Sequence, residues 1–494
     1  MKREVEGIIG STLWDLLDAL PDADYVGPEA SRRRSIVGIS TDTRSVKRRE
    51  LFVALRGEAF DGHRFLDQAV AKEAAAAIVE AGWYRRQRRK ERGIPLIVVD
   101  DTIEAYGAIA AAHRRRFDIP VVAVAGSNGK TSTKDLIVAL LSTKYSVLGT
   151  AKNLNNRIGA PATMLGLTSA HDVAVIEIGT NMPGEIEALC RAIEPTHGVI
   201  TNIGREHLEL LGSIEGVAKE EGALFEWLAD HDGIPFVNVD DPMLRAMGKD
   251  LPNAVTFGRR RGADLRYTVR GVDESGAPIV EIDDARRRGG TMTIRTKTPG
   301  LHTAANTAAA AAVAGSLGIP ARTVVAASSR FTPQVAATGG YARLAMMELP
   351  DGGRVLNDTY NANPDSVRTA LETLASIKVR RGGKRIAVLG DMAELGTHTA
   401  AEHRTVGEVV TALKGIDLVF FFGRQMRRAH EVIVRRGDAT RVTSFSFQSK
   451  SKLLRVLESL RTPDDVVLVK GSRSTAMDEV VTGLVRGTER RTDS

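Results

Sequence analysis

The chain has 494 residues, 43% of them hydrophobic and 26% charged, with a formal net charge of +7. A chain of this length exceeds the size at which one hydrophobic core stops growing, so we expect two to four domains. The basic residues form no tail, and the densest run, residues 85–92, is typical of the solvated end of a helix, so nucleic acid is not an expected partner.

Short apolar strands are predicted at residues 36–40, 51–55, 76–80 and 95–101. The polar stretches 41–45 and 57–63 between them have loop compositions, and binding residues are often on loops. A predicted helix over residues 102–116 follows, so we place the first domain at 1–102.

A β-branched strand at 121–124 runs into a glycine-bounded turn and then a helix with apolar residues at helical spacing. This arrangement suits a polyphosphate, because glycines allow close approach and helix N–H groups face the anion. Lys130 would reach the β- and γ-phosphates, and the Thr131 hydroxyl would bind Mg²⁺. The general P-loop pattern has glycine where Val124 stands, so the loop is a shorter form. The expected nucleotide contacts are Gly126, Ser127, Asn128, Gly129, Lys130, Thr131 and Ser132.

Strands and helices alternate from 121 to about 330, which predicts a parallel sheet covered by helices on both faces. Residues 256–298 alternate between apolar and polar positions, as antiparallel strands do. Four more strands, each ending in a polar loop, begin near residues 355, 385, 418 and 465. We therefore expect an α/β fold with further domains at 103–332 and 333–494.

Two polar residues follow strands of the central unit. Glu177 ends an apolar strand, where a carboxylate can join Thr131 in a Mg²⁺ shell, and His207 follows the next strand. Alone, each is more often a solvated or structural residue. Together with Lys130, they predict a site at one edge of the sheet.

The sequence blocks at 153–165 (NLNNRIGAPATML), 177–186, 201–213, 357–366 (NDTYNANPDS), 390–396 (GDMAELG) and 469–473 resemble the Mur ligase superfamily, the ATP-dependent amide ligases of peptidoglycan synthesis. YNANP and GDMAELG resemble the members that add D-alanyl-D-alanine to UDP-N-acetylmuramoyl tripeptide. Residues 40–63 are similar to the UDP-binding N-terminal domain of these ligases. The alternatives are another ligase of the superfamily and a P-loop ATPase that makes no amide.

The resemblance implies a three-domain architecture: a central P-loop ATPase-like domain with a parallel sheet, a smaller UDP-binding α/β domain before it and a Rossmann-like α/β domain after it. It also implies ATP and Mg²⁺ as cofactors and an acyl-phosphate intermediate. Lys130, Glu177 and His207 would act on the transferring phosphoryl group, with metal ligands Thr131, Glu177 and His207. We expect a cytoplasmic monomer without membrane insertion, because the single Cys190 fits a reducing compartment and no apolar stretch could span a bilayer.

Two departures from the family pattern matter. Many relatives carry a carbamylated lysine on the helix after the histidine; here Glu221 falls at that position and Lys219 stands two residues earlier. We favour Glu221 as a direct metal ligand, with a carbamylated Lys219 as the alternative. In the adenine region, Asn306 keeps the second asparagine of the family motif, and Thr303 replaces the first.

The resemblance further implies that the C-terminal domain closes over the nucleotide and the dipeptide. Arg473 could bind the dipeptide carboxylate or form a structural salt bridge. The expected nucleotide-binding residues there are Asp358, Tyr360 and Asn361. The expected substrate-binding residues are Ser40, Thr41, Asp42, Arg44, Asp61, His63, Asn155, Asn156, Asn363, Asp391, Glu394, Lys470 and Arg473.

Overall fold

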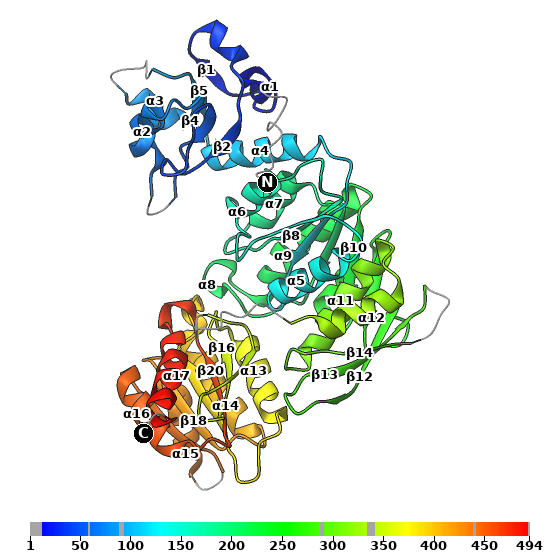
Figure 1. Cartoon of the computed structure of the whole chain (residues 1–494), viewed down its shortest axis with the longest axis vertical. Helices are drawn as coiled ribbons and strands as arrows, with labels where there is room; N and C mark the ends of the chain where they lie inside the picture. Colours follow the sequence, from blue (N-terminus) through cyan, green and yellow to red (C-terminus); the bar gives the residue numbers. More distant parts are fainter. Residues whose placement is uncertain are drawn as a thin grey trace.

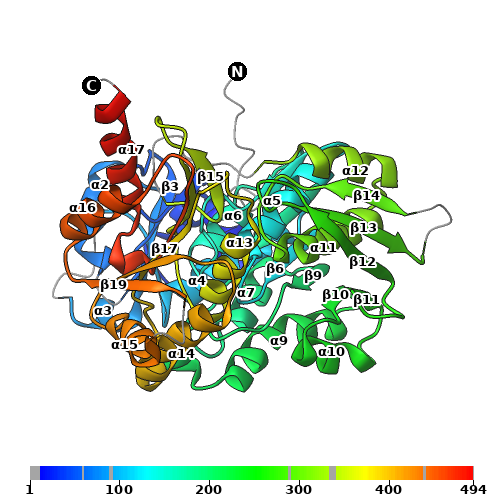
Figure 2. The ribbon, with the colours of Figure 1, turned by 90° about the horizontal axis from the view of Figure 1, so that it is seen from below.

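The computed structural model describes residues 12–57, 60–87, 93–286, 291–332, 341–437 and 441–492. Three β-sheets of five, nine and six strands follow one another along the long axis of the molecule (Figure 1). Viewed along that axis, the strands β12, β13 and β14 form one edge of the central sheet and lie at one side of the molecule (Figure 2). No helix in the described ranges is long and apolar enough to cross a membrane.

The first sheet has the order β1-β5-β4-β3-β2, with only β1 antiparallel to its neighbour. Its strands are β1 (Asp24–Val26), β2 (Gly38–Ser40), β3 (Glu50–Val53), β4 (Ala76–Glu80) and β5 (Leu96–Val99), and its helices are α1 (Leu13–Asp18), α2 (Leu66–Ala71) and α3 (Ala81–Arg85). The four predicted strands are present, and β1 is additional. The basic run begins as predicted at the end of α3, but its residues 88–92 lie outside the described ranges.

Helix α4 (Thr102–Arg114) joins the first sheet to the second. The Asp101 carboxylate caps it by accepting hydrogen bonds from the N–H groups of Ile103 and Glu104. Ile109 and Ala110 are buried in one apolar cluster with residues of both sheets. The predicted boundary at 102 therefore falls where a shared helix begins, and the division at this residue stays a prediction.

The central sheet has the order β14-β13-β12-β11-β10-β9-β6-β8-β7. It is parallel from β7 to β12, and β12, β13 and β14 pair antiparallel, so the antiparallel prediction was wrong for β11. The strands are β6 (Val121–Ala125), β7 (Val147–Gly149), β8 (Val173–Glu177), β9 (His197–Ile200), β10 (Ile234–Asn238), β11 (Val255–Gly258), β12 (Leu265–Val272), β13 (Pro278–Asp284) and β14 (Met292–Arg295).

Helices cover both faces of this sheet, because alternate residues of the buried strands point to opposite sides. Val121 and Ala123 of β6 lie in one apolar cluster with α7 and α9, whereas Val122 and Val124 lie in a second cluster with α5 and α11. The helices are α5 (Lys130–Leu141), α6 (Gly159–Met164), α7 (Glu185–Ile193), α8 (Leu208–Leu211), α9 (Ile214–Asp230), α10 (Pro242–Met247), α11 (His302–Ser316) and α12 (Ala321–Arg330).

The third sheet has the order β15-β16-β20-β17-β18-β19 and is parallel except for β15. The predicted boundary at 332/333 borders residues 333–340, which lie outside the described ranges, and this division also stays a prediction. The elements are β15 (Ala345–Glu348), β16 (Arg354–Asp358), β17 (Arg385–Gly390), β18 (Leu418–Phe422), β19 (Thr443–Phe447), β20 (Val466–Lys470), α13 (Pro364–Ser376), α14 (Thr399–Ala412), α15 (Arg427–Arg436), α16 (Lys450–Leu460) and α17 (Asp478–Thr492).

Candidate active site

The phosphate loop joins β6 to α5 through two glycines in left-handed conformations. Gly126 has φ +108° and Gly129 has φ +86°. A Cβ atom on Gly126 would lie 2.4 Å from Oγ1 and 2.7 Å from the backbone nitrogen of Thr201. Both the dihedral angle and the close approach therefore require glycine at residue 126.

The segment after β9 holds this loop in place. Ser127 N–H donates to the Asn202 carbonyl at 2.9 Å, and Asn128 N–H donates to Asn202 Oδ1 at 3.1 Å. Asn202 Nδ2 and Thr201 Oγ1 both donate to the Asn128 carbonyl at 2.7 Å. Our sequence reasoning missed Thr201 and Asn202, although both belong to the TNIG block that carried the resemblance.

Three carboxylates surround Lys130, and each has one buried oxygen without a hydrogen-bond donor. These oxygens are Glu177 Oε2, Glu206 Oε1 and Glu221 Oε1. Burial alone would lower the pKa of Lys130, but the three carboxylates outweigh it and raise the pKa. Lys130 is therefore a fixed positive charge at the start of α5.

Glu177 and Glu221 are fully buried and each accepts one hydrogen bond. Asn155 Nδ2 donates to Glu177 Oε1 at 2.9 Å, and Gly126 N–H donates to Glu221 Oε2 at 2.8 Å. Burial raises the pKa of Glu221 to about 7, although Lys130 and the Gly126 N–H oppose this shift. Glu221 thus contacts the phosphate loop directly.

Lys219 lies on the same helix, α9, and is exposed to solvent. Residues two positions apart on a helix point to nearly opposite sides. Of the two alternatives for the carbamate position, the structure brings Glu221 to the phosphate loop and leaves Lys219 away from it.

His207 precedes α8 with the left-handed φ of +48°. Its Nδ1 atom lies 2.7 Å from Glu394 Oε2, and its Nε2 atom lies 3.9 Å from Glu206 Oε2. Burial would lower the pKa of His207, but the hydrogen bond with Glu394 and the charge of Glu206 raise it. Because Glu394 belongs to the loop after β17, this contact joins the central and third sheets.

Charged and aromatic residues of the C-terminal part gather at the ends of β16 and β20. Lys470 Nζ donates to Asp358 Oδ2 at 2.6 Å and to the Asn361 carbonyl at 2.9 Å. The Arg473 guanidinium lies 3.2 Å from the centre of the Tyr341 ring, which is a cation–π contact. Tyr360 has Arg343 over its ring at 4.0 Å.

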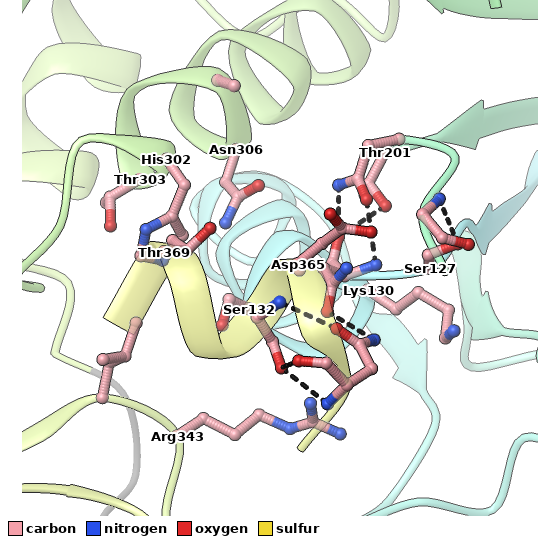
Figure 3. Close-up of a pocket in the computed structure, with 18 of the residues that line it drawn as sticks. Ser127, Lys130, Ser132, Thr201, His302, Thr303, Asn306, Arg343, Asp365 and Thr369 are labelled. Atoms are coloured by element: carbon pink, nitrogen blue, oxygen red, sulfur yellow. Dashed lines mark hydrogen bonds between the residues drawn. The ribbon is translucent and has the colours of Figure 1, made fainter. Parts of the chain in front are cut away.

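All of these residues except Tyr341 line one cavity of about 770 Å³, together with residues 127–130 of the phosphate loop (Figure 3). Figure 3 shows Asn306 and His302 on the side of α11, Lys130 beside the phosphate loop, and Asp365 on helix α13. A Cβ atom on Gly129 would lie 2.8 Å from Asn306 Oδ1, so Asn306 lies against the loop. The expected residues that line the cavity are Ser127, Asn128, Gly129, Lys130, Ser132, Asn155, His207, Asn306, Asp358, Tyr360, Asn361, Asn363, Glu394, Lys470 and Arg473.

Several cavity-lining residues were missed by the sequence reasoning. Glu206 directly precedes His207 in the recognised block, which is the signal that could have found it. Arg343, His302 and Asp365 also line the cavity. Asp365 is part of the NDTYNANPDS block, whereas Arg343 stands in no block that carried the resemblance.

Two expected substrate-binding residues have structural contacts instead. Asp391 accepts hydrogen bonds from the N–H groups of Gln425 and Met426 at 2.7–3.1 Å, directly before α15. Asn156 Oδ1 accepts from the N–H groups of Ile158 and Gly159 and so holds the start of α6. Neither side chain lines the cavity. In each, a side-chain oxygen accepts hydrogen bonds from N–H groups at the start of a helix, which have no partner within the helix.

The expected residues of the first domain do not line the cavity. Ser40, Thr41, Asp42 and Arg44 belong to β2 and the turn after it, where the exposed Arg44 lowers the pKa of Asp42 to about 2 through hydrogen bonds. His63 Nδ1 lies 2.6 Å from Asp61 Oδ1, and its Nε2 accepts from Glu80 N–H at 2.9 Å. Both ring nitrogens of His63 are thus engaged within the fold, and its role in substrate binding stays a prediction.

The remaining expected residues lie beside the cavity rather than on its wall. Thr131 is the second residue of α5 and is partly buried. Gly126 donates its N–H to Glu221, which fills the space behind the loop. The cavity itself therefore presents the loop, Lys130 and His207, with Glu177 and Glu221 behind them.

Comparisons with known proteins agree along the chain. Family models match residues 35–114 (Mur ligase family, catalytic domain), 124–314 (Mur ligase middle domain) and 342–473 (Mur ligase, glutamate ligase domain). The chain is 36% identical over 488 residues to the UDP-N-acetylmuramoyl-tripeptide–D-alanyl-D-alanine ligase of Escherichia coli K12, covering 97% of this chain and 99% of the relative. It is 33% identical over 450 residues to the ligase of the same name from Bacillus subtilis 168, covering 91% and 93%.

Solved structures show the same likeness. A crystal structure of MurF from Acinetobacter baumannii has a TM-score of 0.84 and 28% identity, covering 98% of this chain and all of that one. MurF from Thermotoga maritima in complex with ADP has a TM-score of 0.78 and 26% identity, covering 94% and 100%. The predicted three-domain architecture is confirmed by these matches, and the chain belongs to the Mur ligase family.

Proposed function

We propose that this protein is an ATP-dependent ligase that joins D-alanyl-D-alanine to UDP-N-acetylmuramoyl tripeptide in peptidoglycan precursor synthesis. The observation that carries the proposal is the single cavity in which Lys130 of the phosphate loop and Lys470 and Arg473 of the C-terminal part meet. The relatives from Escherichia coli and Bacillus subtilis bear the name of this ligase. Each aligns with this chain over more than nine tenths of its own length.

The chemistry explains why the cavity needs a phosphate loop. A carboxylate is a poor electrophile, so an oxygen of the tripeptide carboxylate attacks the γ-phosphorus of ATP and ADP leaves. The amino nitrogen of the dipeptide then attacks the acyl carbon and loses a proton, and phosphate leaves as the amide forms. Both steps bring charged groups together, so they depend on positioning and electrostatic stabilisation.

The roles of the protein follow from where its residues lie. Lys130 and the N–H groups of Gly129 to Ser132 would bind the phosphates, and Asn306 would contact the adenine. Asp358, Tyr360 and Asn361 would cover the nucleotide from the C-terminal side. Asn363, Glu394, Lys470 and Arg473 would contact the dipeptide, with the planar Arg473 suited to its carboxylate. Arg343 adds a positive charge to the same wall.

Magnesium fits the residues that are present. Glu177 Oε2 and Glu221 Oε1 are buried without a donor, and His207 holds its Nδ1 against Glu394, as metal-binding histidines do. In the described ranges no group of three His, Cys, Asp or Glu side chains is placed to hold a metal ion, which suits Mg²⁺ because phosphate oxygens and water usually complete its shell. Thr131 and Glu177 would supply ligands to one Mg²⁺ ion and His207 and Glu221 to a second, and their charge would offset the repulsion between the tripeptide carboxylate and the γ-phosphate.

We also assign residues 1–102, 103–332 and 333–494 to UDP binding, ATP binding and closure over the nucleotide and dipeptide. The polar residues Ser40, Thr41, Asp42, Arg44 and Asp61 of the first domain support a role in holding the UDP part of the substrate. This domain would then present the tripeptide toward the loop that contains Asn155.

The proposal is tested by measuring phosphate release with Mg²⁺-ATP, UDP-N-acetylmuramoyl tripeptide and D-alanyl-D-alanine, leaving out one component at a time. We expect release only with all three, and a product mass equal to tripeptide plus dipeptide minus water. Lys130→Met should abolish release, and Lys249→Met, on an exposed lysine away from the cavity, should not. Phosphate release without the dipeptide, and without a new product mass, would show an ATPase instead.

A further inference from the structure

Glu206 is the one carboxylate around Lys130 to which the proposed function assigns no role. Its side chain lines the cavity, and only 8% of the residue is exposed. Its Oε1 atom is buried without any hydrogen-bond donor. A buried carboxylate oxygen that no hydrogen-bond donor satisfies is destabilising, so this oxygen indicates a ligand that completes the site.

Pairing with Lys130 does not account for this carboxylate. The distance from Lys130 Nζ to Glu206 Oε1 is 3.6 Å, which is longer than a hydrogen bond. Lys130 also faces Glu177 and Glu221, so one positive charge is shared among three carboxylates. When a nucleotide places more negative charge beside Lys130, the local imbalance grows, and divalent cations are the natural counter-charge.

His207 places a metal-binding nitrogen next to Glu206. Its Nδ1 is engaged with Glu394 at 2.7 Å, which orients the ring and leaves Nε2 on the side of Glu206. The distance from His207 Nε2 to Glu206 Oε2 is 3.9 Å. Adjacent ligands of an octahedral Mg²⁺ ion, each about 2.1 Å from it, lie about 3 Å apart, so a shift of roughly 1 Å in the Glu206 side chain would let both atoms bind one ion.

We propose that the Glu206 carboxylate is a further cation ligand of the nucleotide cavity and, with His207, holds a divalent cation that accompanies the γ-phosphate. This inference rests on the proposed function, because it assumes that the cavity binds ATP. It adds a second consequence: without the cation, the negative charge of Glu206 repels the nucleotide. Glu206 therefore makes the cavity select the metal-bound form of ATP over the metal-free form.

The test uses Mn²⁺ and the non-hydrolysable β,γ-imido analogue of ATP. Free Mn²⁺ is followed by electron paramagnetic resonance, and binding of the metal-free analogue is followed by calorimetry in a chelator. For Glu206→Gln we expect Mn²⁺ affinity in the nucleotide complex to fall by about tenfold or more. The metal-free analogue should bind more tightly to the same variant, because one repelling charge is gone.

Glu209→Gln is the matched control, because this substitution removes one negative charge from an exposed residue near Glu206. It should leave both affinities at the wild-type values. Glu206→Asp, which keeps the charge and shortens the side chain, should weaken Mn²⁺ binding while leaving the metal-free analogue weakly bound. This variant keeps the proposal testable if Glu206→Gln does not fold.

The outcomes separate this inference from the proposed function. If Glu177→Gln weakens Mn²⁺ binding and Glu206→Gln leaves it unchanged, the role of Glu206 is wrong and the nucleotide site stands. If neither variant changes Mn²⁺ binding, the cation site of the proposed function is wrong as well. A loss of affinity for both Mn²⁺ and the metal-free analogue in Glu206→Gln would indicate a structural role and overturn the proposal.

Discussion

Asn363 Nδ2 donates a hydrogen bond of 3.1 Å to Asn128 Oδ1, which joins the start of α13 to the phosphate loop. Nearby, Leu208 and Leu211 of α8 are buried in an apolar cluster formed mainly by the third sheet and its helices. Polar and apolar contacts therefore hold the C-terminal part against the loop that would bind the phosphates. A nucleotide in the cavity would be covered from this side, which suits the protection of an acyl phosphate from water.

Breaking the ion pair between Arg205 and Asp365 should weaken nucleotide binding. Arg205 donates from its backbone N–H and from Nη2 to the two carboxylate oxygens of Asp365, both at 2.8 Å. The side chains are 30% and 33% exposed, so we expect a coupling of only about 1 kcal/mol. In calorimetry with ADP, Arg205→Met and Asp365→Asn should each weaken binding roughly fivefold.

The double variant should bind ADP no more weakly than Asp365→Asn alone, because both substitutions remove the same side-chain ion pair. Arg427→Met, which breaks an exposed pair with Glu431, is the control and should not change ADP affinity. Additive losses in the double variant would show that the two side chains act separately.

This ion pair also predicts a pH dependence. Burial would raise the pKa of Asp365, but hydrogen bonds from Arg205 outweigh it and lower the pKa. When the pKa of a carboxyl group is lower in the folded protein, the group stabilises the fold. This contribution is complete at pH values above the ordinary pKa of about 4, and it is lost as the pH falls through the lowered pKa. The ratio of wild-type to Asp365→Asn affinities for ADP should therefore be constant between about pH 6 and 8. A ratio that changes over this range would contradict the assignment.

Gly126→Ala should abolish nucleotide binding. The residue has φ +108°, and the new Cβ atom would meet the backbone nitrogen of Thr201 at 2.7 Å, so the loop must move. Gly184→Ala is the matched control: Gly184 has φ +87° with no atom within 4 Å of the new Cβ. Gly184→Ala should lower the free energy of unfolding by about 1–2 kcal/mol and leave ADP affinity unchanged. Equal loss of affinity in both variants would rule out the contact with Thr201 as the cause.

The sequence predicted those parts of the site that local patterns determine. The strand before Gly126, the helix after Gly129 and the strand end at Glu177 follow from β-branched runs, glycines and helical spacing, and each is present. Lys470 of a recognised block and Asn306 of the adenine region also reach the cavity. Local patterns and recognised blocks together were sufficient to locate one wall of the site.

Contacts between distant segments could not be predicted in this way. Asp391 and Lys470 both follow strands of the third sheet, yet the Asp391 carboxylate turns to the N–H groups before α15 and the Lys470 ammonium turns to the cavity. The side of the loop on which each lies depends on the neighbouring helix. Similarly, Glu221 and Lys219 lie on opposite sides of α9, and only the side with Glu221 packs on the sheet. The burial of Leu224 and Phe225 determines which side that is.

Asp391→Asn should reduce stability and leave catalysis nearly unchanged. The carboxylate accepts hydrogen bonds from two backbone N–H groups, and an amide can replace them only in part. We expect a loss of about 1–2 kcal/mol, which lowers the melting temperature by roughly 1–2 °C for a chain of this size. Asp464→Asn, on a side chain 48% exposed, is the control. A large rise of the KM for D-alanyl-D-alanine in Asp391→Asn would restore the substrate-binding role.

Glu221→Gln should lower the rate of amide formation, whereas Lys219→Ala should not. Glutamine keeps an oxygen to accept the Gly126 N–H, so the loop is retained, but it removes the negative charge that would bind the cation. We expect kcat to fall by roughly 10- to 100-fold in Glu221→Gln. Because Lys219 is exposed and points away from the loop, Lys219→Ala should keep wild-type rates, and added bicarbonate should change neither enzyme. Inactivity of Lys219→Ala, together with activation of the wild type by bicarbonate, would instead identify Lys219 as the carbamylated residue, because only a lysine amine can take up CO₂ to form a carbamate.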